Sequence, residues 1–173
     1  METTPDPLEF IMTRRSVRQY TDEPVAEASW SRVLRAGMQA PSAGNQQPWQ
    51  FVVVEDRAVL DAFAEQLPYG KMLKGAPMAI VVVVDMKLVV KEDYWIQDTS
   101  ACLENMLLAA HALGLGAVWV GLFPKEERLA LARDLLGIPA AVVPVAIVPL
   151  GHPAQRQEPA DRYHEDRVHR GRW

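Results

Sequence analysis

Three arginines fall within five residues near the N-terminus: Arg14, Arg15 and Arg18, with Ser16 between them. Guanidinium groups this close repel one another unless they spread over solvent or converge on an anion. Arginine suits phosphate because its planar fork donates paired hydrogen bonds. The segment therefore predicts either a solvated turn or an anion-binding site.

A second polar segment, residues 41–49, reads Pro-Ser-Ala-Gly-Asn-Gln-Gln-Pro-Trp and lies between a predicted helix and a predicted strand. Its prolines and glycine fix and bend the backbone, while Ser42, Asn45 and two glutamines supply hydroxyl and amide groups. Such a loop can bond ribityl hydroxyls or the polar edge of a flavin ring. It is equally typical of an ordinary capped connection with Trp49 buried in the core.

A third segment carries three glycines, at Gly114, Gly116 and Gly121. Because glycine has no side chain, the backbone there can approach a flat ligand closely, and Gly121 would present its N–H to it. Alternatively, Gly114 and Gly116 end a helix and Gly121 ends a strand.

The elements that must position these segments alternate between helices and strands. Asp6-Pro7 predicts the start of a short helix that runs to about Thr13. A helix is expected over about 26–39, with a buried stripe formed by Trp30, Val33, Leu34 and Met38. The later elements are strand 50–55, a helix capped by Asp56, strand 78–84, helix 93–113, strand 117–122, helix 124–137 and strand 142–148. This order is an α/β layered pattern, without the glycine-rich turn of a dinucleotide fold.

Composition excludes several classes of function. The net charge of −4, with no long basic run, argues against nucleic-acid binding. The strongly apolar stretch 78–84 is too short to span a membrane. One cysteine, Cys102, fits a reducing compartment, and the polar residues 1–7 do not resemble a signal peptide. A cytoplasmic protein is expected.

Other titratable residues predict structural roles. Cys102 lies on the predicted long helix, where a buried and inert thiol is expected. The histidines of the tail lack paired ligand spacing, so no metal site is predicted. Asp98 and Glu104 are either acid–base groups or, on a buried helix, partners of nearby backbone or of an arginine.

Taken together, these residues resemble the nitroreductase family of FMN enzymes. The resemblance is carried, in order along nearly the whole chain, by residues 14–18, 41–49, 105–116 and the basic, tryptophan-terminated 167–173. It implies an α+β, three-layer fold whose central mixed, mainly antiparallel β-sheet is flanked by helices. It also implies an interwoven homodimer with FMN between the subunits. Residues 1–173 would form one domain, with 152–173 as an extended C-terminal tail.

The resemblance also implies a role for each matching residue. Arg14 and Ser16 would bind the phosphate or ribityl end of FMN, joined by Arg170 or Arg172 from the tail. Arg18 would lie near the N1–O2 side of the ring, where a cation stabilises negative charge. The full cofactor-binding set is Arg14, Arg15, Ser16, Arg18, Pro41, Ser42, Ala43, Asn45, Gln47, Val120, Gly121, Arg170 and Arg172.

At the ring itself, the resemblance implies that Asn45 bonds the polar edge or the ribityl chain. Pro41 and Ser42 would come from the partner subunit as a wall. The backbone at Gly121 would reach N5, while Val120 stands where many larger nitroreductases carry a glutamate. No side chain would act as catalyst, because hydride passes from NADH or NADPH to FMN and then to a small acceptor.

The acceptor would be a nitroaromatic or a quinone. The alternatives are a different reaction on the same fold, such as dehalogenation, enone reduction or flavin destruction, or a non-catalytic flavin-binding protein. The lid over the flavin, within residues 67–94, would decide between the reactions. By their position, residues 68–71 and Tyr94-Trp95 are candidates to shape the acceptor site.

Overall fold

The computed structural model describes residues 8–155 and 157–173, so the predicted helix start at Asp6-Pro7 lies outside the described residues. The α-helices are α1 (Glu9–Thr13), α2 (Glu27–Met38), α3 (Arg57–Gln66), α4 (Trp95–Ala112) and α5 (Glu126–Leu136). The strands are β1 (Trp49–Val54), β2 (Met78–Asp85), β3 (Gly116–Ala117), β4 (Val120–Gly121) and β5 (Val142–Gly151).

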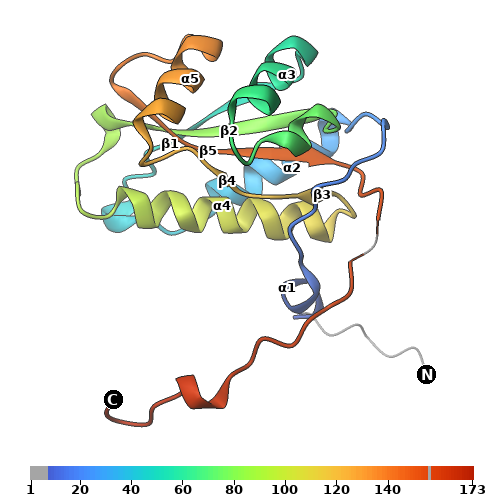
Figure 1. Cartoon of the computed structure of the whole chain (residues 1–173). Coiled ribbons are helices and arrows are strands. Elements are labelled where there is room, and N and C mark those ends of the chain that lie inside the picture. Colours follow the sequence, from blue (N-terminus) through green and yellow to red (C-terminus); the bar gives the residue numbers. More distant parts are fainter. Residues whose placement is uncertain (1–7, 156) are drawn as a thin grey trace.

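The strands form one central sheet with helices on both faces (Figure 1). α2 and α4 cover one face, and α3 and α5 cover the other. The strand order is β1-β2-β5-β3, and β4 also pairs with β5. Every strand pair among the described residues is antiparallel. The α+β, three-layer fold is therefore confirmed, although alternation of elements alone predicts α/β, and no parallel pair forms within the described part of one chain.

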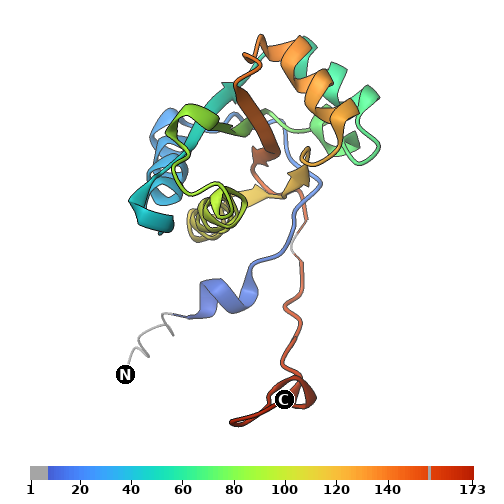
Figure 2. The ribbon, with the colours of Figure 1, turned by 90° about the vertical axis from the view of Figure 1, so that its left-hand side faces the viewer.

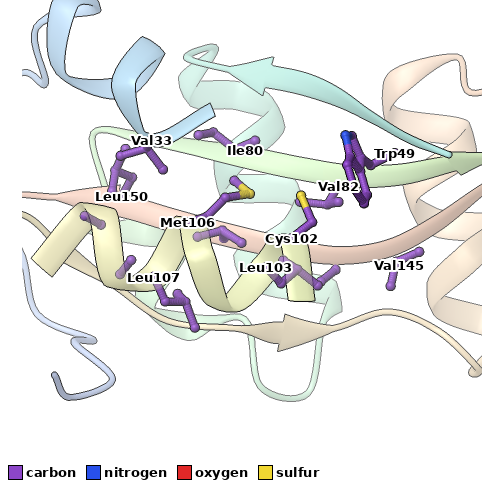
Figure 3. Close-up of a cluster of buried hydrophobic side chains, with 14 of the residues drawn as sticks. Val33, Trp49, Ile80, Val82, Cys102, Leu103, Met106, Leu107, Val145 and Leu150 are labelled. Atoms are coloured by element: carbon purple, nitrogen blue, oxygen red, sulfur yellow. The ribbon is translucent and has the colours of Figure 1, made fainter. Parts of the chain in front are cut away.

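The central strand β2 is buried on both sides because its side chains alternate between two cores. On the α2 and α4 side, the β2 contacts are Ile80, Val82 and Val84. On the α3 and α5 side, they are Ala79, Val81 and Val83. Figure 3 shows the first core, where Cys102, Leu103 and Met106 of α4 meet this strand.

The buried stripe of α2 differs from the predicted one at its C-terminal end. Val33 is buried as expected, but Met38 is 46% exposed and Gly37 is buried in its place. A Cβ on Gly37 would lie 2.7 Å from Cγ of Met106 in α4. The two helices thus approach too closely for a side chain at that point, and the prediction for Met38 was wrong.

The predicted strand 117–122 is divided into β3 and β4, which pair with β5 in one continuous register. Gly116 pairs with Gly151 and Val120 pairs with Ile147, so Val118 would face Pro149. Proline has no N–H to give to a strand ladder, which explains the interruption between the two short strands.

Both ends of the described chain extend away from the three layers (Figure 2). α1 has no buried residue, and residues 157–173 of the tail are all exposed. Near the body the two ends run side by side. The N–H of Thr21 donates to the carbonyl of His152, and that of Ala154 donates to Gln19. Among the described helices, none is both long enough and apolar enough to cross a membrane.

Candidate functional site

The arginine segment, residues 14–18, is fixed to the sheet through Val17. Its N–H donates a 2.9 Å hydrogen bond to the carbonyl of Ala117 in β3. A Cβ on Gly116 would lie 2.6 Å from Cγ1 of Val17, well inside normal carbon–carbon contact. The absence of a side chain at Gly116 therefore lets the arginine segment pack closely against β3. Gly114, with φ +73°, follows the end of α4 as the helix-stop interpretation predicts.

Arg14 is oriented by α4. Its Nε lies 3.3 Å from Oε1 of Glu104, and its side chain is 19% exposed. The expectation that Glu104 pairs with an arginine is confirmed. Among the described residues this is the only polar contact of the Arg14 side chain, which leaves Nη1 and Nη2 to bind a ligand.

Arg15 points to the C-terminal tail instead. Its Nε donates to the carbonyl of Glu158 at 3.2 Å, and its Nη2 donates to that of Ala160 at 3.0 Å. Its Nη1 donates to the carbonyls of Met12 and Arg14. In the single chain, all three nitrogens of this guanidinium thus bind backbone carbonyls.

Ser16 also contacts the tail, but through its backbone. Its carbonyl accepts a 3.1 Å hydrogen bond from Nε2 of Gln157 and a longer one, 3.4 Å, from Nη1 of Arg18. Its hydroxyl makes no hydrogen bond within the described residues, so it is available for a phosphate or a ribityl oxygen.

His111, in the last turn of α4, joins α1 to the body. Its Nε2 lies 2.9 Å from the hydroxyl of Thr13. Burial lowers the pKa of His111, and the nearby positive charges of Arg14 and Arg15 lower it further. The imidazole therefore stays neutral at pH 7 and adds no charge to the two arginines.

The loop at residues 41–47 is held by a buried carboxylate. Oδ1 of Asp98 accepts a 2.9 Å hydrogen bond from the N–H of Ala43, and Oδ2 accepts one of 2.6 Å from Gln46. Asp98 is only 6% exposed, and its predicted backbone partner is confirmed. This carboxylate attaches the loop to α4, and that structural role explains why an acidic side chain is buried there without any need for an acid–base function.

The loop backbone is unusual in having non-glycine residues with positive φ. Asn45 has φ 56° and Gln47 has φ 44°, next to Gly44 with φ 60°. The side chains compensate, because Oγ of Ser42 accepts from the N–H of Gln47 and Oδ1 of Asn45 accepts from its Nε2. Such strained residues persist where the surroundings hold them and often lie at ligand sites.

A cavity of about 430 Å³ contains part of the predicted site. Arg18, Val120 and Gly121 line it, and from the predicted lid so do Tyr69 and Lys71. A Cβ on Gly121 would meet no atom closer than 3.9 Å, so the strand is open to the cavity there. Neither of the other lid candidates, Tyr94 and Trp95, is among the lining residues, and Trp95 packs edge-on against Phe123 with ring centroids 5.0 Å apart.

Arg128 of α5 also lines this cavity, and nothing in the sequence pattern singles it out. Its Nη1 donates a 2.9 Å hydrogen bond to the carbonyl of Gly121. Its guanidinium carbon lies 5.8 Å from the ring centroid of Tyr69. The contacts join residues 69, 121 and 128, which only the folded chain brings together.

A second cavity, of about 560 Å³, lies between α1, the end of α4 and the tail. Arg15, Val17 and His111 line it, together with apolar residues such as Phe10 and Leu115. It is the larger of the two cavities, but Arg14, Ser16, Arg18 and the Gly121 strand are not among its lining residues.

One chain does not bring all the predicted residues together. Pro41, Ser42, Ala43, Asn45 and Gln47 lie by Asp98, toward the opposite end of α4 from His111. Arg170 and Arg172 are exposed and, within the described residues, make no hydrogen bond or ion pair with the arginine segment.

The predicted burial of the Cys102 thiol on α4 is confirmed. Cys102 is fully buried, and this burial raises the pKa of its thiol to about 12. In the described part of the chain, no three histidine, cysteine or acidic side chains cluster as a metal site would require.

The family model described as "Nitroreductase family" matches residues 11–72 and 63–152 of the chain. A relative from Archaeoglobus fulgidus, named "Putative NADH dehydrogenase/NAD(P)H nitroreductase", is 47% identical over 170 residues, covering 96% of this chain and 98% of the relative. A crystal structure of the same name from Bacteroides thetaiotaomicron is 40% identical with a TM-score of 0.93, over 99% of this chain and 100% of that one. A Desulfovibrio desulfuricans structure, "a putative nitroreductase in complex with FMN", is 38% identical with a TM-score of 0.82, over 95% and 96%.

Proposed function

The chain belongs to the nitroreductase family, and on this basis we propose that it is an NAD(P)H-dependent oxidoreductase that uses FMN and reduces small acceptors such as nitroaromatics or quinones. The observation that carries the proposal is the cavity in which Arg18 lies with Val120 and Gly121. Its volume of about 430 Å³ falls within the usual range for ligand pockets.

The residues present fit FMN chemically. The unbonded Nη groups of Arg14 and the hydroxyl of Ser16 are donors suited to the phosphate and ribityl oxygens. Arg18 supplies positive charge that favours negative charge on the N1–O2 edge of a bound ring. Gly121 lets the backbone approach the ring without a side chain in between. When bound, FMN supplies the hydride chemistry between NAD(P)H and the acceptor.

We propose that a second copy of the chain completes the site. The loop at 41–47 and the arginines Arg170 and Arg172 lie away from the cavity in one chain, so they are available to a partner. α1 exposes Phe10, Ile11 and Met12, and a dimer would bury such apolar side chains. The proposal thus treats residues 1–173 as one domain, with its tail lying along the partner, and the lone Cys102 fits a cytoplasmic location.

The test begins with purified protein and added FMN under nitrogen. We expect a yellow protein that NADH or NADPH bleaches and that a nitroaromatic or quinone turns yellow again. A protein that takes up no FMN would refute the proposal. A flavin-bound protein that neither nucleotide reduces would favour the non-catalytic alternative.

Arg14→Ala tests the phosphate site. We expect weaker FMN binding by about 1–3 kcal/mol, the range for a lost charge-assisted hydrogen bond. Arg32→Ala, which removes an exposed arginine of α2, is the matched control and should leave the affinity unchanged. Equal affinities in the two variants would remove Arg14 from the site.

A further inference from the structure

The cavity that contains Arg18 is positively charged, although the chain carries a net charge of −4. Arg18, Lys71 and Arg128 line it, and no lining residue is acidic. None of these three side chains forms an ion pair within the described residues. A cavity lined by charges of one sign concentrates ligands of the opposite sign.

Arg128 is the cation of this group with a fixed orientation. One side of its guanidinium is held by the Gly121 carbonyl, 2.9 Å from Nη1. The Tyr69 ring lies 5.8 Å from its central carbon, and this ring is itself 71% exposed. Nε is buried without a hydrogen-bond partner in the described chain. Nη2 makes no hydrogen bond within the described residues and is not among the buried atoms, so it is the donor left for a ligand.

We propose that Arg128 is an anion-recognition residue that selects substrates with a carboxylate or phosphate group. This inference rests on the proposed function, because it places the ligand in the same cavity as the flavin ring. Arg18 serves the ring, and Arg128, bonded to Gly121 from α5, serves the molecule that enters next to it. Two sources supply such an anion: a carboxylate on the acceptor, or the pyrophosphate of the nicotinamide nucleotide.

The experiment compares wild type with Arg128→Gln and Arg128→Lys, and with Lys125→Gln as matched control. Lys125 is an exposed cation that precedes α5 and does not line the cavity. The acceptors are 4-nitrobenzoate and 4-nitrobenzamide, which are nearly equal in size and differ in charge. Flavin reduction by NADH and reoxidation by each acceptor are followed separately, and FMN affinity is measured for every variant.

We expect Arg128→Gln to lower the ratio of the nitrobenzoate to the nitrobenzamide rate constant by about 10- to 100-fold, as for a lost charge-assisted bond. Arg128→Lys should keep part of the preference, and Lys125→Gln should keep all of it. If reduction by NADH falls instead, while the acceptor ratio holds, the nucleotide pyrophosphate is the anion. If Arg128→Gln slows both acceptors equally and leaves reduction by NADH unchanged, Arg128 only supports the fold and the inference is wrong.

A binding measurement separates this inference from the proposed function. Benzoate and benzamide are not reduced, so calorimetry measures their affinity with or without bound FMN. If the acceptor supplies the anion, wild type should bind benzoate more tightly than benzamide, and Arg128→Gln should remove the difference. If the nucleotide pyrophosphate is the anion, Arg128→Gln should instead lower the affinity for NADH. A protein that binds no FMN yet keeps an Arg128-dependent anion preference would refute the proposed function alone. No Arg128 dependence for benzoate or NADH would overturn the inference.

Discussion

Replacing Gly116 by alanine should displace the arginine segment from the sheet. The new Cβ would lie 2.6 and 2.8 Å from Cγ1 and Cβ of Val17, and 3.1 Å from its Cγ2. Relaxed carbon–carbon contacts are about 3.5–4.0 Å, so the neighbour must move. Valine is branched at Cβ, and rotation about χ1 cannot take its Cβ out of the way.

The cost follows from these contacts. Overpacking of this kind costs about 1–3 kcal/mol. A shift of Val17 also weakens the 2.9 Å hydrogen bond to Ala117, which adds about 0.5–1.5 kcal/mol. We therefore expect Gly116→Ala to lower the free energy of unfolding by about 1.5–4.5 kcal/mol, from the sum of the two ranges. FMN affinity should fall too, because Val17 lies between Ser16 and Arg18.

The assay is guanidinium-induced unfolding at one protein concentration without FMN, followed by a separate FMN titration. Gly75→Ala is the control, since Gly75 has φ −105° and open space around it. The free energy of unfolding of the Gly75→Ala variant should stay within about 0.5 kcal/mol of that of wild type. If Gly116→Ala behaved like this control, the steric argument would be refuted. Adding Val17→Ala should restore part of the loss, because it removes two of the three close atoms.

Three further outcomes are expected. Asp98→Ala should lower the unfolding free energy by about 1–3 kcal/mol, because the partly buried N–H of Ala43 loses its acceptor; Asp98→Asn should lose less, and equal losses would contradict this. Arg15→Ala should speed chymotryptic cleavage after the exposed Tyr163, since the tail loses its clamp at Glu158 and Ala160; an unchanged rate would argue against the clamp. Burial keeps the Cys102 thiol protonated up to a pKa of about 12, while in the unfolded chain it ionises near 9. Stability should thus fall as pH rises between 9 and 12, less steeply in Cys102→Ala.

The helices and strands could be predicted because their signals are local. Asp56 caps α3 as expected, with Oδ1 accepting the N–H of Ala58, and β2 lies within one residue of its predicted span. The divided strand at 116–121 could not be predicted from its own residues. The interruption comes from Pro149, about thirty positions later in the sequence, which the pairing of β3 and β4 with β5 places opposite Val118.

For the candidate site, too, contacts between residues far apart in the sequence could not be predicted. Chemical type and close spacing identified Arg18, and Gly121 lies in the same cavity as expected. A role for Arg128 could not be predicted, because a single arginine in a helix carries no functional signal in the sequence. Only the folded chain brings it into contact with Gly121 and Tyr69. The binding roles of the loop at 41–47 and of the tail arginines stay predictions, because they depend on contacts that one chain does not contain.

The clamp formed by Arg15 has a consequence for the order in which the protein is made. Arg15 and its partner Glu158 are 143 residues apart, so the ribosome releases the arginine segment long before the carbonyls that hold it. β3, which anchors Val17, is also synthesised about a hundred residues later. During translation the three arginines therefore have no fixed place, and contacts over such long separations form slowly. If the segment binds an anion as proposed, its binding geometry is complete only after residue 160 has left the ribosome.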